Sequence, residues 1–207
     1  MEIKRAVEDL QVIRILMERS AVYRRALAPI MLFTGAIGVL AAGAGLYFQV
    51  VEPRAFAGLW LATAAAAVSG AFLLARRQAI QDEEPFWSPP TRRVGQALLP
   101  PLLCGLFIGL MLVTLDASWM VNLPMAMIWM LFYGCALNSA GFLMTRGIKW
   151  FGWIFIISAM ALVILWLRAN LSSNSWSGNL VMGFFFGALH LAYGGYLYLT
   201  EKRKNAA

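Results

Sequence analysis

Residues 27–48 read LAPIMLFTGAIGVLAAGAGLYF, a long run without a single charge. A helix needs about 20 apolar residues to cross the hydrocarbon core of a bilayer. Five similar runs follow, and the sequence predicts six transmembrane helices over residues 27–48, 55–75, 97–115, 124–144, 150–167 and 180–199. Unpaired backbone groups are too costly in lipid, so these spans must be helical. The runs are continuously apolar rather than alternating, which excludes porin-like strands.

The composition of the whole chain supports an integral membrane protein. Apolar residues make up 61% of the 207 residues, and charged residues only 13%, against about 25% in an ordinary soluble domain. The mean hydropathy is +0.70. A soluble fold of this length cannot hide that much apolar surface, so a water-soluble enzyme is excluded. The same composition excludes a disordered chain or a disulfide scaffold.

The distribution of lysine and arginine predicts the orientation of the spans. Fifteen of the 17 cationic residues lie before the first span, after the second, after the fourth and in the tail, whereas only Arg54 and Arg168 lie on the other side. The positive-inside rule therefore places both termini in the cytoplasm. The basic segments are expected to meet anionic lipid headgroups. No DNA-binding motif accompanies them, so nucleic acid is not an expected partner.

The segments outside the spans are short. Residues 1–25 carry apolar side chains at helical spacing and charges on the opposite face, which predicts an amphipathic helix at the cytoplasmic interface. An alternative is that this helix docks a protein partner or a second copy of the chain. The loop 76–96 is the only long connection, and its prolines exclude one continuous helix. Residues 201–207 form a basic cytoplasmic tail.

Small residues predict how the spans pack. In the second span Gly58, Ala62, Ala66 and Gly70 recur at every fourth position. Such a stripe allows two helices to approach closely, and dispersion between close helices is the main attraction available in lipid. The first span has similar spacings, so we expect a tight pair of spans one and two. Homodimerisation through the stripe is the alternative.

His190, the only histidine, is the main candidate for a polar site inside the bilayer, because it lies about 15 Å deep in the sixth span. It shares a helix face with three glycines that are expected to pack against another helix: Gly183, Gly187 and Gly194. Asn138 in the fourth span is its counterpart, with Tyr133 and Tyr193 as neighbouring polar groups. In the structural interpretation, His190 and Asn138 form a hydrogen bond between helices. In the functional interpretation, the four residues line a small polar site.

Metal and cofactor binding are not expected from this sequence. One histidine and two isolated cysteines, Cys104 and Cys135, do not form a metal-ligand motif. Haem would need a second axial ligand, and eleven methionines make any single match uninformative. We expect the two cysteines to be reduced, buried thiols at similar depth that pack as small apolar residues.

Three segments resemble a known family: residues 3–20, residues 132–138 with FYG and ALN, and residues 186–198 with FG, His190, YG and Tyr198. The chain is similar to an uncharacterised family of six-span bacterial inner-membrane proteins, often encoded beside a small winged-helix transcriptional regulator. The resemblance implies a role in sensing or regulation, and no established substrate or catalytic residue. The acidic, proline-rich loop departs from that pattern.

The sequence predicts an all-α protein that is not an enzyme. It contains no HExxH motif, paired aspartates, nucleophile elbow or phosphate loop. We expect a non-catalytic membrane subunit that binds a partner or takes part in sensing or regulation. The alternative is a small transporter, channel or substrate-binding component that uses the polar site around His190 and Asn138.

Overall fold

The computed structural model describes residues 26–81, 83, 85–115, 122–144, 146–168 and 177–205, and within these residues it contains helices and turns but no strand. Six helices are long and apolar enough to cross a membrane, as the sequence predicts. The first five are Ala26–Tyr47, α2 (Pro53–Gln81), α3 (Pro89–Thr114), α4 (Asn122–Ala140) and α5 (Arg146–Arg168). The sixth is continuous but has three parts: α6 (Ser177–Met182), the π-helix η1 (Gly183–Ala188) and α7 (Leu189–Asn205). The amphipathic helix predicted for residues 1–25 lies outside the described residues.

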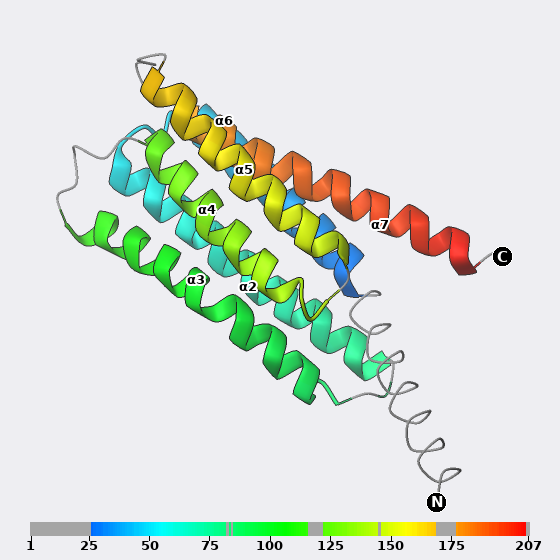
Figure 1. Cartoon of the computed structure of the whole chain (residues 1–207). Coiled ribbons are helices and arrows are strands. Elements are labelled where there is room, and N and C mark those ends of the chain that lie inside the picture. The colour runs from blue at the N-terminus through cyan, green and yellow to red at the C-terminus, as the bar shows by residue number, and fades with distance from the viewer. Residues whose placement is uncertain are drawn as a thin grey trace, which may run out of the picture.

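The six spans run up and down through one bundle. Because their number is even, the first span begins and the sixth span ends at the same end of the bundle. In Figure 1 the helices run from upper left to lower right, and the last turn of α2, the first turn of α3 and the last turn of α7 are all right-hand ends. Arg54 in the first turn of α2 and Arg168 at the end of α5 belong to the opposite end. The two ends of the bundle therefore differ strongly in their number of cationic residues.

The helices α2, α3 and α5 and the sixth span are all longer than hydropathy predicts. The helix α2 continues through Arg76 and Arg77 to Gln81, and α3 begins at Pro89. Proline is well suited to the first turn of a helix, where its missing N–H has no intrahelical partner. The predicted bounds of the loop 76–96 are therefore wrong, because α2 ends only at Gln81 and α3 begins at Pro89, whereas the prediction that one continuous helix does not cross this segment is confirmed. The helix α7 likewise continues to Asn205, through the first five residues of the predicted tail.

The backbone of the first helix packs closely against the sixth span. A Cβ added at Gly35 would lie 2.6 Å from the backbone nitrogen of Leu191, and one at Gly38 would overlap the Phe186 carbonyl. On the sixth span, all three glycines that share a face with His190 lie in this contact, against Ala42, Val39 and Leu32. Matching small residues on both helices bring the two backbones together, which increases dispersion along the whole contact.

The expected pair of spans one and two is wrong along most of the α2 stripe. Nothing lies within 4 Å of a Cβ added at Gly58, and Ala62 and Ala66 are exposed. Only Gly70 meets the first helix, at the Phe33 ring. The reason is that α2 turns Phe56, Ala57 and Trp60 inward instead. Large aromatic rings gain more dispersion from burial than alanines do.

The helix α4 is the centre of the bundle. Eleven of its residues are buried, and it packs against α3, α5 and α6. Two apolar clusters lie along it. The cluster nearer the Arg54 end includes Phe56, Trp60 and Trp129, and the cluster nearer the other end includes Phe151 and Phe155. The second cluster surrounds His190.

Candidate functional site

His190 is fully buried, and two elements of the fold hold its ring. Its Nδ1 atom lies 2.9 Å from the backbone carbonyl oxygen of Phe185, in the π-helix η1 one turn earlier. Its Nε2 atom lies 2.7 Å from the Tyr133 hydroxyl on α4. A carbonyl oxygen can only accept a hydrogen bond, so Nδ1 carries the proton. In the neutral ring Nε2 is then an acceptor, and the Tyr133 hydroxyl donates to it.

Aromatic rings enclose this hydrogen bond on several sides. The His190 ring meets Phe151 edge to face at a centroid distance of 5.0 Å and Phe155 at 5.6 Å, and it stacks on Phe186 at 6.1 Å. Tyr133 contacts Phe155 and Phe186, each at 5.0 Å. Surroundings of this kind have a low dielectric, which strengthens a hydrogen bond that is formed and makes an unformed one costly.

The π-helix η1 brings the rings of span six to this cluster. It has the sequence GFFFGA, with Phe185 buried and Phe184 exposed. The Phe185 ring meets Phe155 at 5.6 Å, and the next residue, Phe186, stacks on His190. Two consecutive rings thus face the same cluster, while Gly183 and Gly187 still face the first helix. π-Helical turns often occur at functional positions, and here the turn positions the histidine.

Tyr193 belongs to the same aromatic cluster, but it forms no hydrogen bond with His190. Its ring stacks on Phe151 at 4.7 Å with an interplanar angle of 16°. Its hydroxyl lies against Gly147, at the start of α5. Phe151 therefore separates Tyr193 from His190. The structure brings together three of the four candidate residues: His190, Tyr133 and Tyr193.

Asn138 is not part of this cluster, and its expected hydrogen bond to His190 is wrong. Both nitrogens of His190 are already used by Tyr133 and Phe185. The Nδ2 atom of Asn138 is buried and has no hydrogen-bond partner. The backbone of Asn138 lies where α4 and α5 are in close contact: a Cβ added at Gly152 would lie 2.8 Å from the Asn138 nitrogen. The predicted four-residue polar site is therefore reduced to three residues.

A second polar cluster near the Arg54 end was not predicted. Asn179 is fully buried, accepts a hydrogen bond from Trp60 Nε1 at 3.0 Å and donates to the Val50 carbonyl oxygen at 3.0 Å. Asn122 donates to the next carbonyl, that of Val51, also at 3.0 Å. Both asparagines open similar sequences, NLPMA at 122–126 and NLVMG at 179–183. That similarity was the available signal for their equivalent roles.

Trp129 provides a further hydrogen bond between spans. Its indole nitrogen donates to the Gly105 carbonyl oxygen of α3 at 2.9 Å, and its ring stacks on Phe56 of α2 at 6.1 Å. It therefore connects α2, α3 and α4. Its role resembles that of Tyr133 in the other cluster, since both combine a buried ring with one polar bond across helices.

The cysteines and the acidic residues do not assemble a metal site in the described part of the chain. There, no three His, Cys, Asp or Glu side chains lie together. Cys104 and Cys135 are both exposed on the outside of the bundle. The expectation that the two thiols are buried is wrong, because α3 and α4 turn other small residues, including Gly105 and Ala136, inward.

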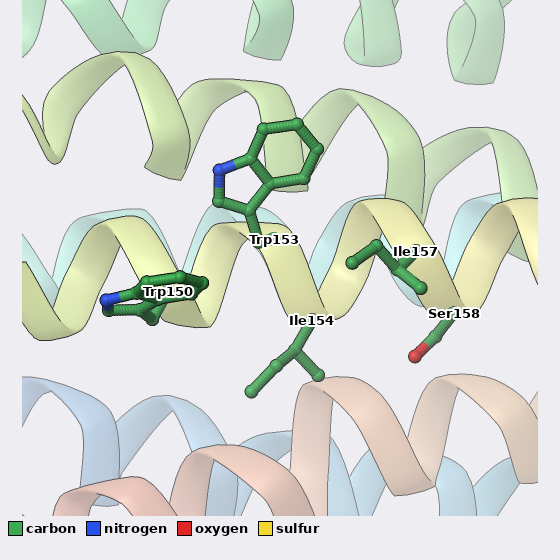
Figure 2. Close-up of a pocket in the computed structure, with 5 residues that line it drawn as sticks. All are labelled: Trp150, Trp153, Ile154, Ile157 and Ser158. Atoms are coloured by element: carbon green, nitrogen blue, oxygen red, sulfur yellow. The ribbon is translucent and has the colours of Figure 1, made fainter.

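A surface pocket of about 460 Å³ lies away from His190, on the outer side of α5. Figure 2 shows its lining residues, all from this one helix: Trp150, Trp153, Ile154, Ile157 and Ser158. The pocket opens outward and is separate from the aromatic cluster.

Comparisons with protein-family models, with curated proteins and with solved structures give no match to this chain. In the described residues, the hydrogen bonds of Tyr133, Trp129 and Asn179 connect one helix or turn to another.

Proposed function

We propose that this chain is a non-catalytic subunit of the bacterial inner membrane that binds a partner and takes part in sensing or regulation, with both termini in the cytoplasm. The six apolar helices fit a multi-pass membrane protein. The orientation rests on the excess of lysine and arginine at the end of the bundle where the chain enters and leaves. The same cations favour contact with anionic lipid headgroups.

The observation that carries the non-catalytic role is the pairing of His190. A general base or a metal ligand needs a nitrogen that can reach substrate or metal. Both His190 nitrogens are instead bonded within the bundle, and four aromatic rings surround them. Asn179, Trp60 and Trp129 are likewise bonded to other helices or turns. These polar groups stabilise the bundle.

The proposed partner is a protein in the cytoplasm. The resemblance to a family encoded beside winged-helix regulators supports a regulator of that kind. Contact through residues 1–25 follows from the charged and apolar faces of that segment. The alternative is self-association through the same segment, which predicts crosslinks between two copies of this chain.

Two experiments test this proposal. In the first, a C-terminal fusion to GFP is expected to fluoresce, and a C-terminal fusion to alkaline phosphatase is expected to be inactive. The opposite result would refute the orientation. In the second, photo-crosslinkers placed along residues 1–25 in native membranes are expected to capture a second protein. Capture of the chain alone would refute the hetero-partner and favour a homo-oligomer.

The transporter alternative has its own test. If a polar site at His190 carried a solute, His190→Ala would abolish flux or binding in liposomes. We expect no solute flux from the wild-type protein, and only a loss of stability from the substitution. Measurable wild-type flux that depends on His190 would overturn the non-catalytic, non-transport role.

A further inference from the structure

The outer face of α5 combines a groove with an ordered series of side chains. Two neighbouring rows, each with a spacing of four residues, border the groove: Trp150, Ile154 and Ser158 in one, and Trp153 and Ile157 in the other. Figure 2 shows Trp153 and Ile154 extending to opposite sides of the helix, with Trp150 lying along it. Trp150 is 70% exposed and Ile157 is 60% exposed. The neighbouring helices leave this face uncovered.

A cation stands at the start of this face. Lys149 precedes Trp153 by four residues and therefore continues the same row toward the charged end of the bundle. Its Nζ atom lies 3.9 Å from the centre of the Phe142 ring. Cation–π contact of this kind holds an ammonium group in place without neutralising it. Lys149 forms no ion pair with a carboxylate among the described residues, so its charge remains available to an anion.

We propose that this face binds one anionic phospholipid, with its phosphate at Lys149 and one acyl chain in the groove along Trp153 and Ile157. From the charged end inward, the side chains change from cation to indole to aliphatic. A phospholipid changes in the same order, from phosphate to the ester region to the acyl chain. Lys149 and Ser158 are separated by about 13 Å at 1.5 Å per residue, enough to hold the upper part of one chain.

The chemistry of the face favours a lipid over a transmembrane helix of a partner. Helices in membranes associate through small residues that allow close backbone approach. This face instead presents two tryptophans and two isoleucines around a hollow. Indole rings at the boundary of the hydrocarbon are well suited to the ester region of a lipid. Basic groups at the cytoplasmic boundary are suited to anionic headgroups.

The inference rests on the proposed membrane location, and native mass spectrometry of the full chain tests it. The protein is released from nanodiscs that contain equal amounts of phosphatidylglycerol and phosphatidylcholine with identical chains. We expect the wild type to retain one phosphatidylglycerol in preference to phosphatidylcholine. Lys149→Gln should reduce that preference about fivefold, the effect of one cation near a membrane surface. Trp153→Ala should reduce retention of both lipids.

Matched variants separate this site from general surface effects. Arg77→Gln removes an exposed cation from α2, at the same end of the bundle as Lys149. Phe107→Ala removes an exposed ring from α3. Both should retain the one bound phosphatidylglycerol as the wild type does, because Arg77 contacts headgroups only at the general membrane surface and neither residue borders the α5 groove. Lys149→Arg should keep the preference. Equal retention of the two lipids by the wild type would overturn the inference, as would an equal loss in Arg77→Gln. If the protein inserts into nanodiscs and one of these two results is found, the lipid site is refuted but the proposed membrane location is not.

Discussion

The Tyr133 hydroxyl on α4 donates a hydrogen bond to Nε2 of His190 in span six, over a distance of 2.7 Å. The two residues are 57 positions apart in the sequence. The bond connects the central helix to the segment that follows the π-helix, while the other ring nitrogen is bonded to Phe185. His190 thus holds the π-helical turn of its own span through Phe185, and it holds α4 against that span through Tyr133.

Replacing Tyr133 by phenylalanine is expected to destabilise the bundle. The ring contacts with Phe155 and Phe186 remain, but Nε2 of His190 loses its donor while it stays enclosed by aromatic rings. The cost should be about 1–2 kcal/mol, the range for a buried polar group left unpaired and for hydrogen bonds between membrane helices. Thermal unfolding of the purified protein in detergent measures it. Tyr198→Phe, at an exposed position of α7, is the control; equal melting temperatures for all three proteins would contradict the prediction.

The spans could be predicted from the sequence because a bilayer imposes a minimum apolar length. The first helix, Ala26–Tyr47, differs from the predicted 27–48 by one residue at each end. The ends of α2 and α3 could not be predicted in this way. Hydropathy reports only the length of an apolar run, whereas α2 continues as a helix past Arg76 and Arg77 to Gln81. Nothing in apolar periodicity marks where such an extension stops.

The site was predictable in part. The depth of His190 and the glycines on its face correctly indicated that it faces other helices. Its pairing with Asn138 failed for a geometric reason: Tyr133 and Asn138 are five residues apart, which places them about 140° apart around an α-helix. A histidine that meets one cannot also meet the other. The choice of partner for the first helix was not predictable either, because glycine spacings occur in both α2 and span six, and only the packed structure decides between them.

The contact between the first helix and span six gives a second prediction, with a control in the same helix. In Gly38→Ala the new Cβ would overlap the backbone carbonyl of Phe186, which cannot move without separating the helices. We expect a loss of about 1–3 kcal/mol, as for other overpacked positions. Gly43→Ala introduces a Cβ into open space. It should leave stability unchanged or increase it slightly, since alanine favours helix. Equal effects of both substitutions on thermal unfolding would show that the contact is not close.

The end of the first helix gives a third prediction, in the opposite direction. Gln49 has a φ of 49°, and the hydrogen bonds from Val50 N to Gly45 O and from Gln49 N to Leu46 O form a Schellman motif. A position with positive φ favours glycine, because any residue with a Cβ is strained there. Gln49→Gly should stabilise the protein by about 0.5–1 kcal/mol. Gln49→Ala keeps a Cβ there and should give no gain. A rise in melting temperature for the alanine variant equal to that for glycine would exclude backbone strain as the cause.

The fourth prediction concerns the coupling between Asn179 and Trp60. Asn179→Leu leaves the Trp60 indole N–H without its acceptor and the Val50 carbonyl without its donor, so we expect a loss of about 2–4 kcal/mol. Trp60→Phe removes the indole donor and leaves only one oxygen of Asn179 unpaired. If the two side chains stabilise the fold through one shared bond, the double variant should lose less stability than the sum of the single losses. Unfolding of all four proteins in the same detergent gives the coupling free energy. A value of zero would mean that the bond between the two residues contributes nothing, and that each acts only through its own packing.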